Sequence, residues 1–233
     1  MSELKPINSE TLAEKAYRHL CEAIVAGQFK PGEKLTIRGL AADLEISPTP
    51  IRDALRRLAT ERVVDLEPNR YISIPRLTVE ALRELRDVRM NLEGIAVERA
   101  ALRIEPDTLA ELRALDNQIR ALRGTGDVKA TARKIQQLHF CLYGAAGMPL
   151  LEGIIHGLWL RTAPNLGLLF PVYSQKERGT MRGLMIDSLE RADARSARRF
   201  VEADICGAMD YIIDLHRQAE ASGVPLAAAE ERR

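Results

Sequence analysis

The sequence predicts a mainly α fold, in which an N-terminal winged helix-turn-helix with a small β-hairpin wing precedes a C-terminal all-helical bundle. Three short amphipathic segments are followed by two β-prone runs, and only a few residues separate the second segment from the third. This is the spacing of a helix-turn-helix. After residue 78 every apolar repeat has helical spacing, which predicts the bundle.

Start signals mark the three N-terminal helices. Thr11 and Glu14 form a capping box, at which we expect the first helix to begin. Thr36 is placed to cap the second helix. Ser47 followed by Pro48 predicts the start of the third helix, because serine is a favoured N-cap and proline is tolerated at the first helical position.

The wing is predicted from two β-prone runs, residues 63–66 and 71–74, that flank a Pro-Asn turn. We expect residues 1–76 to form the winged-helix domain, residues 77–222 the helical domain and residues 223–233 a disordered tail. In the helical domain the apolar repeats predict helices over about 79–96, 106–122, 135–142, 150–160, 181–189 and 200–215.

Composition and charge narrow the range of possible functions. The net charge is +1 and the first 76 residues are nearly balanced, which disfavours a nonspecific architectural DNA binder and leaves DNA binding to local charge placement. The three cysteines, Cys21, Cys141 and Cys206, form no disulfide framework or CxxC pair. The N-terminus lacks the apolar segment of a signal peptide and no stretch is long enough to span a membrane. We therefore expect a cytoplasmic protein without membrane contact.

The third helix carries the residue types that read DNA. A recognition helix presents its N-terminal residues to base edges, and Arg52, one turn beyond Ser47 and Thr49, can donate two hydrogen bonds to guanine or hold a phosphate. The alternative is that these are ordinary solvated side chains. The predicted DNA-contacting residues are Arg38, Ser47, Thr49, Arg52, Arg56, and, at the wing tip, Asn69 and Arg70.

The run PGEKLTIRGLAADLEISPTPIRDALRRLATERVVDLEPNR resembles the winged helix of the GntR family of bacterial regulators, and the resemblance extends over about residues 12–74. It implies that Arg38, Thr49 and Arg52 contact the operator. Two positions depart from the family pattern, since Pro48 stands where arginine is usual and Tyr71 replaces the wing glycine. We therefore expect an operator that differs from the commoner sites of the family.

Residues from about 79 to 219 resemble the ligand-binding FCD domain of the FadR-type subgroup, in segments such as LHFCLYGAAGMPLL. Many members of that subgroup hold a divalent metal through one aspartate and three histidines. Here His139 matches the first histidine, but Ile135, Arg182 and Asp204 stand at the other three positions. One histidine and one carboxylate are too few for a tight zinc site, so we expect no required cofactor. If a divalent metal binds, His139 and Asp204 are its candidate ligands.

Charged residues on apolar helix stripes suggest a different ligand. Arg89, His139, Arg182 and Asp204 each share a predicted helix face with apolar residues. Because buried charges are costly unless paired or liganded, these four either line one cavity or pair with each other as salt bridges. A guanidinium grips a carboxylate with two hydrogen bonds. We therefore predict a small organic-acid effector held by Arg89 and Arg182, with Arg161 as a further candidate and His139 as hydrogen-bond partner.

These observations predict a sequence-specific, DNA-binding transcription regulator. Winged helices usually read pseudo-palindromic operators as two-fold dimers, so we expect a homodimer on double-stranded DNA. Repression relieved by ligand is the mode that the family resemblance implies. The alternatives are a metal-dependent ligand sensor or a metal-dependent hydrolase using His139 with Cys141 or Asp204. An enzyme is disfavoured, because the sequence has no nucleophile elbow, P-loop, HExxH motif or dinucleotide fingerprint.

Overall fold

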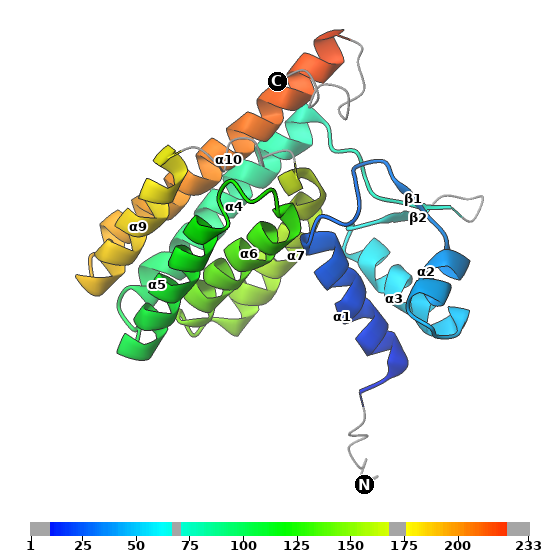
Figure 1. The fold of residues 1–233 in the computed structure, drawn as a ribbon, viewed down its shortest axis with the longest axis horizontal. Helices are drawn as coiled ribbons and strands as arrows, with labels where there is room; N and C mark the ends of the chain where they lie inside the picture. The colour runs from blue at the N-terminus through cyan, green and yellow to red at the C-terminus, as the bar shows by residue number, and fades with distance from the viewer. Residues whose placement is uncertain (1–9, 67–70, 168–175, 223–233) are drawn as a thin grey trace, which may run out of the picture.

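The structure of the protein, a computed structural model, describes residues 10–66, 71–167 and 176–222. It contains a compact N-terminal domain of short helices and strands beside a bundle of longer helices (Figure 1). The predicted wing tip, Asn69 and Arg70, and the predicted tail, 223–233, lie outside the described residues.

The N-terminal domain has the three helices that the sequence predicts, and their start signals act as expected. Thr11 Oγ1 accepts a hydrogen bond from the Glu14 N–H, while the Glu14 carboxylate accepts one from the Thr11 N–H at 2.7 Å. Thr36 Oγ1 accepts from the Gly39 N–H at 3.0 Å. The helices are α1 (Leu12–Val25), α2 (Ile37–Asp43) and α3 (Pro48–Thr60).

The wing is an antiparallel hairpin, as predicted. Strand β2 (Asp65–Leu66) pairs with β3 (Ile72–Ser73), and Asp65 lies opposite Ser73. A third strand, β1 (Lys34–Leu35), pairs with the other edge of β3. This strand was not predicted, because two residues are too short to show an alternating pattern.

The C-terminal domain is helical throughout its described part, which confirms the predicted class. The helices α4 and α10 pack along one another, and α9 lies against α10 (Figure 1). None of the described helices is long and apolar enough to cross a membrane. The elements are α4 (Val79–Ala100), α5 (Pro106–Ala121), α6 (Val128–Gly144), α7 (Pro149–Leu166), α9 (Lys176–Glu190) and α10 (Ala194–Ser222).

Helix α7 belongs to two hydrophobic cores. Ile155 and Trp159 are buried in the core of the helical bundle. The next residue, Leu160, and Ala163, one turn beyond Trp159, are buried in the core of the winged-helix domain, among side chains of α1 and α3. The helix therefore forms part of both cores and joins the N-terminal domain to the bundle.

The role of α7 can be tested with two leucines of that helix. Leu160 is fully buried, whereas Leu150 is 81% exposed. We expect Leu160→Ala to lower the free energy of unfolding by about 2–5 kcal/mol, because it leaves a cavity between the domains. The control Leu150→Ala should change it by less than about 0.5 kcal/mol. Urea titration followed by circular dichroism measures both, and equal effects would contradict the shared core.

Candidate functional site

The recognition helix α3 is held with one face in the core and one face in solvent. Helix α2 ends at Asp43; two residues later Glu45 has a left-handed φ of 53°, and the Ile46 N–H bonds back to the Ala41 carbonyl at 3.0 Å. This turn directs α3 so that its apolar face is buried. The described residues that the sequence predicts for DNA contact are all exposed: Arg38, Ser47, Thr49, Arg52 and Arg56.

Ser47 occupies the N-cap position of α3, but its hydroxyl makes no capping hydrogen bond. The reason lies in the sequence that follows. A serine cap usually accepts from the N–H of the second or third helical residue, and the third residue here is Pro50, which has no N–H. The Ser47 hydroxyl and the Thr49 side chain therefore lie at an exposed helix start without a local role.

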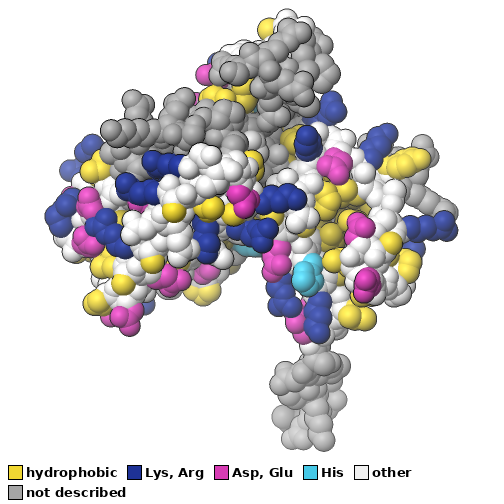
Figure 2. All heavy atoms as spheres, in the orientation of Figure 1, with side chains coloured by type: hydrophobic (Ala, Val, Ile, Leu, Met, Phe, Trp, Pro, Cys, Tyr) yellow, Lys and Arg dark blue, Asp and Glu magenta, His cyan; other side chains and the backbone are white. Residues whose placement is uncertain are grey.

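The arginines of this surface differ in how far their guanidiniums are free to contact DNA. Arg57 is 56% exposed but engaged within the domain, since its Nε lies 3.2 Å from Glu61 Oε1 and its guanidinium stacks 3.7 Å from the Tyr17 ring centroid. Arg56 Nη1 is 3.6 Å from Asp53 Oδ1. Arg52 forms no ion pair with another described residue. Figure 2 shows basic and acidic side chains interspersed over the visible face, so the surface has no single basic patch there.

Polar side chains from all six described helices of the bundle meet in its interior, and we call them the polar cluster. Four of the five predicted effector residues belong to it, since the charges of Arg89 and Arg182 both act on His139 and Asp204 Oδ2 lies 3.8 Å from His139 Nε2. The cluster comprises Arg89 and Glu93 of α4, Asp116 of α5, His139 and Tyr143 of α6, Trp159 of α7, Arg182 of α9 and Asp204 of α10.

One half of the polar cluster is a closed hydrogen-bonded chain. Arg89 Nε donates to Glu93 Oε1 at 2.6 Å, and the Tyr143 hydroxyl donates to Glu93 Oε2. His139 Nδ1 lies 2.8 Å from the Tyr143 oxygen. The Arg89 guanidinium also lies 4.7 Å from the Trp159 ring centroid. The sequence left open whether Arg89 pairs with protein or with ligand, and the structure pairs it with Glu93, one helical turn along α4.

The protonation states follow from burial. Burial and the charge of Glu93 raise the pKa of Tyr143 well above its ordinary value, so its hydroxyl keeps the proton that it donates. Burial, together with the charges of Arg89 and Arg182, lowers the pKa of His139 to about 3. His139 is therefore neutral, and we assign its proton to Nδ1, which donates to the Tyr143 oxygen. Its Nε2 then carries a lone pair and makes no hydrogen bond to a described residue.

The other half of the cluster surrounds Asp116. Arg182 Nε lies 3.3 Å from Asp116 Oδ1, and Arg120 Nε donates to Asp116 Oδ2 at 2.7 Å. Arg182 is 2% exposed, and its Nη1 is buried without a hydrogen-bond partner. A buried donor without a partner is uncommon in folded proteins and costs free energy.

Arg161 is separate from this arrangement. It follows Trp159 by two residues, which places it on nearly the opposite side of α7. No hydrogen bond, ion pair or ring contact joins it to the polar cluster within the described part of the chain. Its Nε is buried without a hydrogen-bond partner, for which we have no structural account.

A divalent metal does not fit the residues of the cluster. Within the described ranges no three His, Cys, Asp or Glu side chains come close enough to hold a metal ion. Arg182, at one of the positions where the resemblance implies a histidine, brings a positive charge to His139 that opposes a cation. Cys141 offers no hydrolytic nucleophile, because burial and the charge of Glu111 raise its pKa to about 11.

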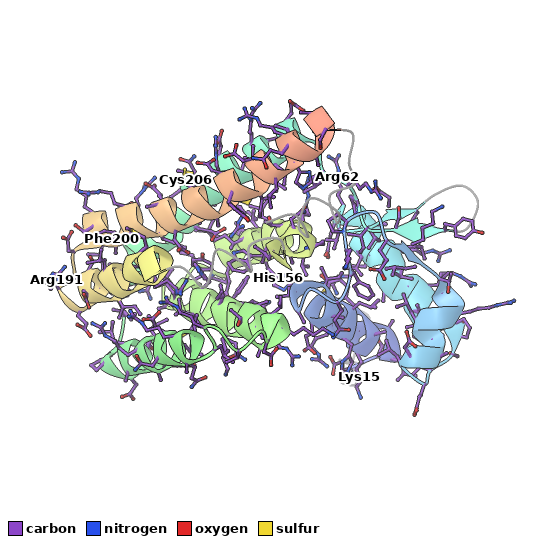
Figure 3. All side chains as sticks on the ribbon, turned by 45° about the horizontal axis from the view of Figure 1, so that its top comes forward. Lys15, Arg62, His156, Arg191, Phe200 and Cys206 are labelled. Carbon is purple, nitrogen blue, oxygen red and sulfur yellow. The ribbon has the colours of Figure 1, made fainter. Side chains whose placement is uncertain are left out.

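Aromatic rings connect the polar cluster to the DNA-binding domain. Trp159 lies 5.1 Å from His139 and 5.6 Å from Phe140, measured between ring centroids. Phe140 in turn lies 5.6 Å from His156. His156 lies on α7 where this helix meets α1 (Figure 3), and the charges of Glu61 and Arg57 at the end of α3 act on its pKa. Ring contacts thus run from the cluster to His156, and an electrostatic interaction joins His156 to the end of the recognition helix.

A winged helix with an exposed recognition helix, packed on a helical domain with a buried polar cluster, defines a DNA-binding regulator with a sensory domain. Comparison with known protein families supports this classification. Residues 12–74 match the model of bacterial regulatory proteins of the gntR family, and residues 84–205 match the FCD domain. The chain belongs to the GntR family and carries an FCD domain.

Known proteins of this family share both domains. The chain is 30% identical over 151 residues to the HTH-type transcriptional regulator McbR of Escherichia coli strain K12, covering 65% of this chain and 68% of McbR. The solved structure of E. coli McbR/YncC superposes with a TM-score of 0.83 at 25% identity, over 88% of this chain and 99% of that one.

A named repressor is also similar to part of the chain. The gluconate operon transcriptional repressor of Bacillus subtilis strain 168 is 37% identical over 84 residues, which are 36% of this chain and 34% of the repressor. The family and these relatives make the protein a transcription regulator and not an enzyme, as the sequence predicts.

The closed half of the cluster can be tested through Glu93, which is fully buried. We expect Glu93→Ala to lower the free energy of unfolding by about 3–5 kcal/mol, because it leaves the buried Arg89 charge without its acceptor. The control is Glu84→Ala on the same helix, where the side chain is exposed and in no ion pair. Chemical denaturation compares the two, and a Glu93→Ala variant as stable as the control would refute the buried pair.

Proposed function

We propose that the protein is a repressor that binds a pseudo-palindromic operator as a homodimer and releases it when a small organic acid enters the polar cluster. The observation that carries the effector proposal is Arg182, a fully buried guanidinium whose Nη1 has no hydrogen-bond acceptor among the described residues. On this proposal the chain divides near residue 76 into a DNA-binding and an effector-binding domain, and it acts in the cytoplasm, where bacterial operators lie.

The operator proposal rests on the N-terminal end of α3. Arg52 is exposed and unpaired within the described residues, and Ser47 and Thr49 present hydroxyls at the helix start. These groups suit base edges and phosphates in the major groove. Arg38 is placed for the phosphate backbone, and Asn69 and Arg70 are proposed for the minor groove. One such surface reads one half-site, so a two-fold dimer is needed for a pseudo-palindrome.

The effector proposal assigns a different role to each residue. Arg182 Nη1 donates to a carboxylate of the ligand, and the lone pair of His139 Nε2 accepts a hydrogen bond from a separate donor group of the same ligand, such as a hydroxyl. Arg89 acts indirectly, because its pairing with Glu93 holds Tyr143 and His139 in place. Asp204, at 3.8 Å from His139 Nε2, closes the far side of the same space.

The coupling proposal follows the aromatic contacts. A ligand changes operator affinity only to the extent that it binds two arrangements of the protein differently. A ligand against His139 also meets Trp159, and Trp159 touches Phe140 and through it His156. The charges of the Arg57–Glu61 pair, at the end of the recognition helix, act on His156. A small displacement in the cluster thus has a packed route to the DNA-binding surface.

The operator contact is tested with Arg52→Ala. We expect operator affinity to fall by about 1–3 kcal/mol, the usual contribution of a two-pronged arginine contact to a base pair. The control is Arg195→Ala, which removes an equal charge from an exposed position on α10. Fluorescence anisotropy on an operator selected from random duplexes measures both. Equal affinities of the two variants would exclude Arg52 from the interface.

The effector site is tested with Arg182→Gln, with Arg191→Gln as the matched control at the exposed end of the same segment (Figure 3). Small carboxylates are screened by thermal shift before and after chelation, and hits are added to the protein–operator complex. We expect an acid that releases the operator from the wild type and the control but not from Arg182→Gln, which still binds DNA. Stabilisation that disappears on chelation would instead indicate a metal-dependent sensor.

A further inference from the structure

Three guanidiniums gather around one carboxylate at the contact between α5 and α9. Arg182 and Arg120 occupy Asp116 Oδ1 and Oδ2, at 3.3 and 2.7 Å. The third, Arg123, stands just beyond the end of α5 and makes no hydrogen bond to Asp116. Sequence analysis did not select Arg123, because it lies beside a glycine-containing turn and on no apolar stripe.

Arg123 and Arg182 both carry guanidinium N–H groups without a hydrogen-bond acceptor among the described residues. Arg123 Nε and Nη2 and Arg182 Nη1 are all buried without a hydrogen-bond partner. A single unpartnered donor is explained by an ordered water, but a water leaves the charges uncompensated. Three donor atoms on two neighbouring guanidiniums are the complement of an anion with several oxygens.

The two charges are close enough to affect one another. Burial lowers the pKa of Arg123, and the charge of Arg182 lowers it further. A guanidinium nevertheless stays protonated in proteins, so the fold places a fully buried cation, Arg182, beside a half-buried one, Arg123. Their natural partner is an anion with two negative charges, which compensates both guanidiniums at once.

We propose that the effector is a doubly charged oxyanion, a dicarboxylate or a phosphoryl compound, and that Arg123 binds its second charge. The inference rests on the proposed effector site and deepens it. The charge of Arg182 acts on both His139 and Arg123. On this proposal the ligand meets His139, Arg182 and Arg123 together. A monocarboxylate has two oxygens and one charge and leaves part of this set unpaired.

The inference makes an unusual prediction for the protein without ligand. Arg123→Gln removes a half-buried charge that desolvation and the charges of Arg182 and Arg120 disfavour, so we expect its melting temperature to rise above that of the wild type. The matched control is Arg113→Gln on α5, which loses ion pairs to Asp187 at 2.5 Å and Glu190 at 2.8 Å and should melt lower. A melting temperature of Arg123→Gln below the wild type would mean that this arginine already has its partner, and would overturn the inference.

Direct binding completes the test. The full-length wild type, Arg123→Gln and Arg113→Gln are titrated calorimetrically with inorganic phosphate, malonate and acetate at constant ionic strength. We expect phosphate or malonate to bind the wild type and Arg113→Gln at least about tenfold more tightly than acetate, and Arg123→Gln to lose that preference. Preference for phosphate indicates a phosphoryl effector, and preference for malonate indicates a dicarboxylate.

The outcomes separate this inference from the proposed function. If acetate binds as well as the dianions and Arg123→Gln changes nothing, the dianion inference fails while Arg182 remains a carboxylate site. If a dianion binds through Arg123 but no acid alters operator affinity, the inference stands and the effector-controlled repressor fails. If the wild type binds none of the three anions, the dianion site does not exist.

Discussion

The buried ion pair between Arg89 and Glu93 is the interaction on which the helical domain depends. A guanidinium and a carboxylate removed from water lose more hydration free energy than their attraction returns, unless every hydrogen bond is completed. Glu93 is completed by Arg89 on one oxygen and Tyr143 on the other. Tyr143 then orients His139, and Arg89 lies over Trp159. The relative positions of α4, α6 and α7 follow from these contacts.

The two halves of the polar cluster differ in how completely their hydrogen bonds are satisfied. We therefore place the proposed ligand at the less satisfied half. The Arg89 half is satisfied within the protein and rigid. The Arg182 half lacks acceptors among the described residues, because the two Asp116 oxygens face Arg182 Nε and Arg120 Nε and bond to neither Arg182 Nη1 nor Arg123. A ligand that supplies these acceptors binds the folded state alone, and so stabilises it in proportion to the logarithm of its concentration. The same deficit costs stability without ligand, which is the usual compromise of a binding site.

Helix α7 links the polar cluster to the DNA-binding domain. Its buried residues are divided between the two cores, with Trp159 in the bundle and Leu160 in the winged-helix domain. A close-packed interior transmits displacement rather than absorbing it. On the proposed mechanism, a ligand that contacts Trp159 displaces helix α7, whose other face is part of the DNA-binding domain. The signal then reaches DNA without a separate movement of the linker.

The sequence by itself determined the features that depend on near neighbours. Capping at Thr11 and Thr36, the helix-turn-helix spacing, the hairpin and the exposure of Arg52 all follow from residues a few positions apart. Stripe periodicity also identified His139 and Arg182 as interior, since a 3.6-residue repeat is visible in one chain.

Only the tertiary structure decided which buried polar side chains pair with one another. Arg182 and Asp116 are 66 residues apart in the sequence, and Glu93 and Tyr143 are 50 apart, so no local pattern links them. Arg161 shares the residue type of the cluster but faces away from it, which depends on the rotation of α7. Arg123 became a candidate only because helix packing withheld an acceptor from it. A local pattern shows that a charge is buried, whereas its partner is set by which helices meet.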